Sequence, residues 1–240
     1  MDFEVLGILL DRKKFCRGSQ NAPIEIRRIL PQMETFIDKV DLEDHGFVDL
    51  GNIVAKPYKE MIAEASIKID GKFPVFIGGD HSVSYIGVKT VKPKVFVSFD
   101  AHPDCEEGDL RYDTVTRKIA EDSIKVMLYG TRCFSKKEWK YIKDKKIKLA
   151  TLEDLKNINE PVYLSIDFDV LDPTVMPAVG NPEPDGLTFK QVMDGVKALA
   201  KNLVAIDFVE FVPTENTTDT LMAGKLIYHS LAEIVKAKLQ

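Results

Sequence analysis

The feature that most constrains the fold is the alternation of short apolar runs with longer amphipathic segments along the 240 residues of the chain. Several short runs are apolar at consecutive positions, as expected of parallel strands that helices cover on both faces. The longer segments have the spacing of amphipathic helices. The predicted strands are residues 5–10, 47–50, 75–77, 95–99, 126–129, 162–166 and 203–208.

The predicted helices lie between these strands. Thr188 and Asp219 are expected N-caps, and Ile227, Leu231 and Ile234 have the spacing of one buried helical stripe. The predicted helices are residues 23–30, 58–69, 82–89, 115–120, 136–144, 189–200 and 219–238. Such alternation predicts an α/β fold in three layers (αβα), in which helices cover both faces of a mostly parallel central sheet. Because we find no repeat or Gly/Ser linker, we expect residues 1–240 to form one domain.

Composition excludes some classes of partner. The formal net charge is −5, so no basic surplus indicates a nucleic acid or an anionic membrane as partner. The first apolar run is too short to span a membrane and lacks the features of a signal peptide. Cys16, Cys105 and Cys133 are widely spaced and form no CxxC motif. This pattern is typical of reduced thiols and predicts a cytoplasmic protein.

Polar residues follow four of the predicted strands at the point where each strand ends. His81 follows the strand at 75–77, Asp100 the strand at 95–99, and Asp167 the strand at 162–166. Glu210 comes shortly after the strand at 203–208. In α/β sheets of this kind, ligands bind beyond the carboxyl ends of the strands. We therefore expect these acidic and imidazole groups to meet at one edge of the sheet.

Two of these segments carry several candidate metal ligands each. In the extended segment Asp-Ala-His-Pro-Asp at 100–104, residues at i, i+2 and i+4 point the same way, and Asp-Phe-Asp at 167–169 repeats the device. Carboxylates mixed with imidazoles suit Mn²⁺, Zn²⁺ or Fe²⁺ better than Ca²⁺. Because the ligands are too many for one small ion, they indicate a two-metal site that activates water for hydrolysis. The predicted ligands are His81, Asp100, His102, Asp104, Asp167 and Asp169.

The segment Gly-Gly-Asp-His-Ser at 78–82 is interpreted as a turn that presents His81. Two glycines permit a tight turn with unusual backbone angles, after which Ser82 would open a helix. Asp80 has two interpretations that the sequence leaves open: it could orient an imidazole, or it could be a turn residue. Asp172, which precedes a proline, is expected to be structural rather than a ligand.

With these motifs in place, the chain resembles the arginase–agmatinase (ureohydrolase) family. The segments at 78–82, 100–104 and 165–173 match the family's three metal motifs in order. The segment at 17–27 looks like its early Gly-Pro-x-x-Ile-Arg element, and 209–213 is similar to its Glu-x-x-Pro element. The resemblance therefore runs nearly from end to end.

The resemblance implies two metal ions, usually manganese, that share Asp100 and Asp167. The water they activate would attack the carbon of a small cationic guanidino or amidine substrate. Asp104 would orient that water and relay its proton, and Glu210 would bind the planar cation. The alternative for Glu210 is a solvated acid at a strand end. The first ion would be held by His81, Asp100, Asp104 and Asp167, and the second by His102, Asp100, Asp167 and Asp169.

Family members also suggest agmatine as the substrate, which water would convert to putrescine and urea, and a homo-oligomeric assembly. Arginine, guanidinobutyrate and formiminoglutamate remain open as substrates. A haloacid-dehalogenase-type phosphatase is the remote alternative, because the segment at 163–170 resembles its Asp-x-Asp motif. That alternative leaves the motifs at 78–82 and 100–104 unexplained. A related deacetylase would usually show a His-His pair, which this sequence lacks.

The chain departs from the family on the side that delivers a proton to the leaving amine. Hydrolytic members commonly carry a further histidine in the loop after the second metal motif, where this chain has Tyr112 and Asp113. A tyrosine of ordinary pKa is a poor acid at neutral pH. His45 is expected to be a turn residue and His229 to be solvated. A weakly active or non-catalytic metal-binding relative is therefore a second hypothesis.

Overall fold

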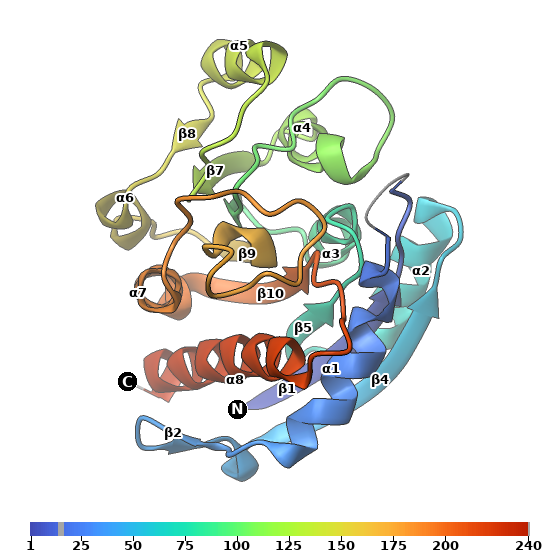
Figure 1. Cartoon of the computed structure of the whole chain (residues 1–240), viewed down its shortest axis with the longest axis vertical. Helices are drawn as coiled ribbons and strands as arrows, with labels where there is room; N and C mark the ends of the chain where they lie inside the picture. The colour runs from blue at the N-terminus through green and yellow to red at the C-terminus, as the bar shows by residue number, and fades with distance from the viewer. Residues whose placement is uncertain (14–16, 240) are drawn as a thin grey trace.

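The computed structural model describes residues 1–13 and 17–239, so Cys16 lies outside the described residues. In this part of the chain, eight strands form one sheet in the order β4-β1-β5-β10-β9-β6-β7-β8 (Figure 1). Each pair of neighbours in the sheet is parallel. The strands are β1 (Asp2–Leu9), β4 (Gly46–Val54), β5 (Phe73–Ile77), β6 (Val95–Phe99), β7 (Lys125–Tyr129), β8 (Lys148–Leu149), β9 (Val162–Asp167) and β10 (Leu203–Val209).

Helices cover both faces of this sheet, which confirms the predicted three-layer fold. One buried cluster joins the sheet to α1 (Ala22–Ile29), α6 (Leu152–Lys156), α7 (Phe189–Leu199) and α8 (Thr217–Leu239). A second cluster, on the opposite face, involves α2 (Tyr58–Lys68), α3 (Val83–Val91), α4 (Val115–Glu121) and α5 (Lys136–Lys145). Among the described residues, no helix combines the length and the apolar character needed to cross a bilayer.

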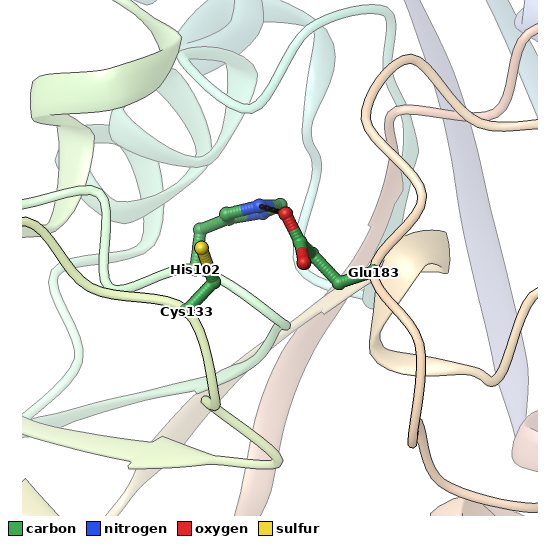
Figure 2. Close-up of side chains that lie close together, drawn as sticks. All are labelled: His102, Cys133 and Glu183. Atoms are coloured by element: carbon green, nitrogen blue, oxygen red, sulfur yellow. Dashed lines mark ion pairs between the residues drawn. The ribbon is translucent and has the colours of Figure 1, made fainter.

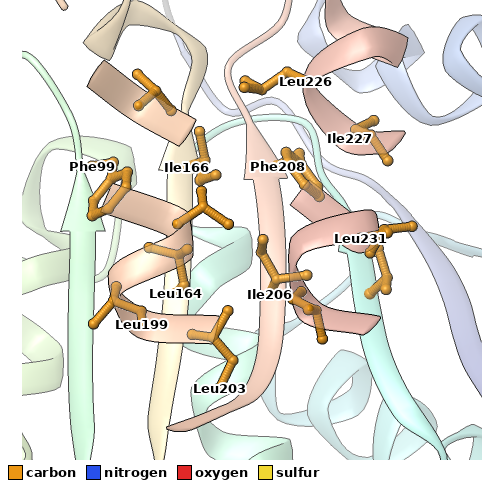
Figure 3. Close-up of a cluster of buried hydrophobic side chains, with 14 of the residues drawn as sticks. Phe99, Leu164, Ile166, Leu199, Leu203, Ile206, Phe208, Leu226, Ile227 and Leu231 are labelled. Atoms are coloured by element: carbon orange, nitrogen blue, oxygen red, sulfur yellow. The ribbon is translucent and has the colours of Figure 1, made fainter. Parts of the chain in front are cut away.

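The central strands contribute side chains to both buried clusters, because successive side chains along a strand point to opposite faces of the sheet. On β9, Leu164 and Ile166 enter the cluster under α7 and α8, whereas Tyr163 enters the cluster on the other face. Figure 3 shows the first cluster, in which Ile206 and Phe208 of β10 lie beside these two residues and face the helices. Every residue of β5, β6 and β9 is buried, which explains their mainly apolar sequence.

The elements that the sequence did not predict are short. Apart from short 3-10 helices, they are the hairpin of β2 (Phe36–Ile37) and β3 (Val40–Asp41), the edge strand β8, and α6. Two-residue strands show no periodicity, and α6 spans little more than one turn. The N-cap prediction is correct for Thr188, whose side chain accepts a hydrogen bond from the Gln191 amide. It is wrong for Asp219, which lies in the first turn of α8, while the Asn216 side chain accepts from the Thr218 amide at 3.2 Å.

Two helical isoleucines test the packing of the core. Ile234 of α8 is fully buried, whereas Ile67 of α2 is 82% exposed. We expect Ile234→Ala to lower the free energy of unfolding by about 2–5 kcal/mol, because it leaves a cavity in the core. The matched change Ile67→Ala should stay within about 0.5 kcal/mol of the parent protein. Urea titrations followed by circular dichroism measure both, and equal effects would contradict this packing.

Candidate metal centre and substrate pocket

The predicted site residues come from four strands that are adjacent in the sheet. The order β5-β10-β9-β6 places these strands in the middle of the sheet, so the residues that follow their carboxyl ends lie close together. His81 follows β5, Asp100 follows β6, Asp167 ends β9, and Glu210 follows β10. The predicted convergence at the carboxyl ends of the strands is what the structure shows.

His81 lies at the centre of three carboxylates. Its Nδ1 atom is 2.9 Å from Oδ2 of Asp104 and 3.0 Å from Oδ2 of Asp100. Oδ2 of Asp167 lies 3.4 Å from the same nitrogen. All four side chains are buried. These are the four residues assigned by resemblance to the first metal ion.

His102 lies in a second group that shares Asp100 with the first. Nδ1 of His102 is 3.0 Å from Oδ2 of Asp169 and 3.6 Å from Oδ1 of Asp100. Asp100 therefore faces the two imidazoles with its two different oxygens. Backbone amides fix these carboxylates as well, since the amide of Asp169 donates to Oδ1 of Asp167 at 2.9 Å and that of Ala101 to Oδ1 of Asp169 at 3.1 Å.

The chemistry of this donor set fits divalent cations. Burial, together with the nearby Asp100 carboxylate, raises the pKa of the Asp104 carboxyl to about 8. Burial likewise raises the pKa values of the Asp167 and Asp169 carboxyls. Nδ1 of His81 and Oδ2 of Asp100 are buried and lie 3.0 Å apart, yet neither atom makes a hydrogen bond of acceptable geometry in the described part of the chain. Positive charge placed between these groups would satisfy both atoms and allow the carboxyls to ionise.

The other ring nitrogen of His81 has a hydrogen-bond partner that was not predicted from the sequence. Nε2 lies 3.1 Å from Oγ of Ser165, which lies 3.0 Å from Oγ of Ser84. A partner on Nε2 sets the orientation of the imidazole and directs Nδ1 toward the carboxylates. Ser165 is the residue two before Asp167 on β9, so the alternation of a strand could have indicated its role.

Asp80 is a turn residue and does not orient an imidazole. Its carboxylate accepts from the backbone amide of Arg12 at 2.6 Å and from that of Ser82 at 3.0 Å. Asp172 is structural as predicted, because it accepts from the amides of Thr174 at 3.0 Å and Gly186 at 3.1 Å.

The two glycines before Asp80 serve close packing rather than unusual backbone angles, which corrects the sequence interpretation. Neither has a positive φ. A Cβ on Gly79 would lie 1.8 Å from the carbonyl oxygen of Leu10, and one on Gly78 would lie 2.8 Å from Cγ1 of Val209. The left-handed angles of the site belong instead to Asp104 (φ 48°) and Glu210 (φ 68°), a conformation that is uncommon for residues other than glycine.

A cavity of about 330 Å³ opens above the carboxylate cluster. Asp104, Asp167 and Asp169 line it. Tyr112 and Asp113 line it too, so the loop in which the family's extra histidine is expected does reach the pocket. The Asp113 carboxylate is already paired with the Arg111 guanidinium, at 2.8 Å and 3.0 Å.

Glu210 is buried in this pocket and is not a solvated acid. Its Oε1 atom accepts from the backbone amide of His81 at 2.8 Å, and its Oε2 atom accepts from the ammonium of Lys13. Burial raises the pKa of the Glu210 carboxyl to about 7, while Lys13 acts in the opposite direction. Lys13 lines the same cavity and was not predicted from the sequence, because a lysine in a loop after the first strand carries no distinctive signal.

His102, Cys133 and Asn181 also line the cavity, and His102 has two polar neighbours from the loop that carries Asn181 and Glu183. Its Nε2 atom lies 2.8 Å from Nδ2 of Asn181 and 3.5 Å from Oε1 of Glu183. Figure 2 shows the Glu183 carboxylate reaching the ring, with Cys133 close beside it.

The remaining two histidines lie elsewhere. His45 directly follows the 3-10 turn Leu42–Asp44 and its Nδ1 lies 3.2 Å from the N-terminal nitrogen, in agreement with a turn position. His229 is half-buried rather than solvated, because its ring packs edge-on against Phe189 with ring centroids 5.4 Å apart.

Comparison with known proteins identifies the family of the chain. The family model described as "Arginase family" matches residues 1–232. The agmatinase of Bacillus subtilis is 33% identical over 91% of this chain and 87% of its own. The N(1)-aminopropylagmatine ureohydrolase of Thermococcus kodakarensis is 29% identical over 98% and 91%. The solved structure of the agmatine ureohydrolase of Thermoplasma volcanium superposes with a TM-score of 0.84 at 28% identity, covering 98% of this chain and 90% of the other. The chain therefore belongs to the arginase family and is a hydrolase of that family.

Proposed function

We propose that this protein hydrolyses a guanidino carbon–nitrogen bond and that agmatine is its substrate, giving putrescine and urea. The observation that carries the proposal is the joining of the two imidazole–carboxylate groups through Asp100, directly below a cavity lined by Glu210. Curated relatives named for agmatine or aminopropylagmatine support this substrate class.

Two manganese ions are the proposed cofactor. His81, Asp100, Asp104 and Asp167 would hold the first ion, and His102, Asp169 and the shared Asp100 and Asp167 the second. When bound, such ions lower the pKa of water so that hydroxide forms near neutral pH. The oriented imidazoles, and the carboxylates that accept hydrogen bonds from backbone amides, would keep the ligand atoms in place.

The residues of the chain supply binding and proton transfer. Glu210 would accept hydrogen bonds from the planar guanidinium, whose N–H groups match a carboxylate. Asp104 lines the same cavity and would orient the attacking water and take up its proton. The leaving nitrogen then needs a proton, and Tyr112, which lines the cavity, is the candidate donor. Burial raises the pKa of the Tyr112 hydroxyl, so it is a weak acid there.

A weakly active relative is the second candidate, because two observations favour it. Tyr112 replaces the histidine expected in that loop, and Lys13 already neutralises Glu210. The phosphatase alternative is not favoured, because Asp167 and Asp169 lie with the motifs that it leaves unexplained. For the assembly and location of the protein we propose a cytoplasmic homo-oligomer.

Removal of the Glu210 charge tests the binding role. We expect the manganese-loaded protein to release urea from agmatine, and Glu210→Gln to lower kcat/KM by about 100-fold, since a lost buried charge pair costs about 2–5 kcal/mol. Glu64→Gln, which removes a carboxylate paired with Lys56 away from the pocket, should leave kcat/KM unchanged. A panel of guanidino compounds that yields no urea would contradict the proposed function.

Metal binding should make stability depend on pH in a predictable direction. A carboxyl whose pKa is raised on folding favours the folded protein when protonated, so metal-free protein should lose stability as pH rises from about 4 to about 8, the raised value for Asp104. Bound metal requires ionised ligands, so the gain in Tm on adding manganese should grow over this window. Calorimetry with manganese or a chelator measures this, and a constant or shrinking gain would contradict the ligand assignment.

Restoring a histidine tests the weak proton donor. Tyr112→His should raise kcat for agmatine by about 10-fold or more, within the range that general acid catalysis supplies. The matched change Tyr85→His, at a half-buried tyrosine of α3 on the far side of the sheet from α8, should give no gain. If Tyr112→His leaves kcat unchanged, then delivery of the proton does not limit turnover.

A further inference from the structure

Lys13 is a buried cation inside the pocket, opposite the residue that would bind the substrate's cation. Its side chain is 7% exposed, and that of Glu210 is 8% exposed. Lysine is seldom buried unless it is paired, and here the partner is Oε2 of Glu210. Lys13 and Glu210 both line the cavity above the carboxylate cluster.

The backbone holds Lys13 in this place from two sides. The amide of Lys13 donates to Oδ1 of Asp11 at 3.0 Å, and Oδ2 of the same carboxylate accepts from the amide of Gly18 at 2.8 Å. The amide of Arg12 is bound by Asp80 at 2.6 Å. The lysine is thus attached to the end of β1 and to the turn that presents His81, and its ammonium is directed into the pocket.

Both oxygens of Glu210 already have a donor. Oε1 accepts from the His81 amide and Oε2 from the Lys13 ammonium. Guanidinium and ammonium groups offer donors and no acceptor, so they cannot bond to each other. Two cations that share one buried carboxylate also repel each other strongly where the effective dielectric constant is low.

We propose that Lys13 is a specificity-determining residue of the pocket, because its ammonium competes with a cationic head group for Glu210. A guanidinium binds only in molecules where the Lys13 ammonium has been displaced, and this displacement weakens its apparent affinity. A neutral head group of the same shape meets no such competition, since a carbonyl oxygen can accept a hydrogen bond from Lys13. The inference rests on the proposed function, in which Glu210 receives the head group.

Guanidinium and urea make the sharpest pair of probes, since they share a planar shape and differ in charge and in the acceptor. Isothermal titration of the manganese-loaded protein measures both affinities without catalysis. We expect Lys13→Met and Lys13→Gln to bind guanidinium at least about 10-fold more tightly than the parent protein. Their affinity for urea should stay the same or fall. Lys13→Arg keeps a cation beside Glu210 and should bind guanidinium as weakly as the parent does.

Steady-state kinetics supply the second measurement. Lys13→Met should lower KM for agmatine by the same factor while kcat changes by less than about threefold, because the change removes competition from the free protein. Lys236→Met is the matched control, since it removes a lysine of α8 that is paired with Asp38 and with Glu233. Its KM and guanidinium affinity should equal those of the parent.

The outcomes separate this inference from the proposed function. Tighter guanidinium binding by Lys13→Met without turnover of any guanidino compound would support the role of Lys13 and contradict the proposed function. Normal turnover with guanidinium affinity unchanged or weaker in both Lys13→Met and Lys13→Gln would overturn the role of Lys13. A collapse of kcat with no gain in guanidinium affinity would also overturn it and would assign Lys13 to proton transfer. Lys13→Gln keeps a polar group beside Glu210, so it provides the answer if Lys13→Met does not fold.

Discussion

The rest of the site depends on one electrostatic constraint, the confinement of four buried carboxylates around two imidazoles. Asp104, Asp167 and Asp169 each show the cost, because burial raises the pKa of each carboxyl. In the interior of a protein such groups are stable when protonated or when positive charge lies between them. The fold supplies hydrogen bonds to single oxygens of these carboxylates and leaves other oxygens directed at the imidazoles.

The parallel sheet makes this arrangement possible. Four adjacent strands end together near the middle of the sheet, so residues far apart in the chain meet without long loops of their own. Close packing of Gly79 against the Leu10 carbonyl brings the end of β1 to the turn that carries His81. The same contact region brings Lys13 to Glu210, so one feature of packing joins the carboxylate cluster to the Lys13–Glu210 pair.

The sequence predicts most of the layout and fewer of the details. Short, mainly apolar runs indicate the central strands, and the spacing of acidic and imidazole residues at their ends indicates the cluster around Asp100, because both signals are local. The pairing of Lys13 with Glu210 could not be predicted, since the two residues are 197 positions apart in the chain. The function of the Gly78–Gly79 pair was misassigned because the sequence reveals glycine but not whether angle or space requires it. The prediction that His229 is solvated is wrong because the periodicity of one helix contains no information about its contact with Phe189 of another helix.

The metal content of the purified chain tests the central claim most directly. The account predicts two manganese ions for each chain at saturation, measured by equilibrium dialysis with elemental analysis. It also predicts that Asp100→Asn weakens the binding of both ions, because Asp100 faces both imidazoles. Asp169→Asn should weaken mainly the binding of the ion beside His102. Saturation at one ion for each chain, or none, would contradict the two-metal site.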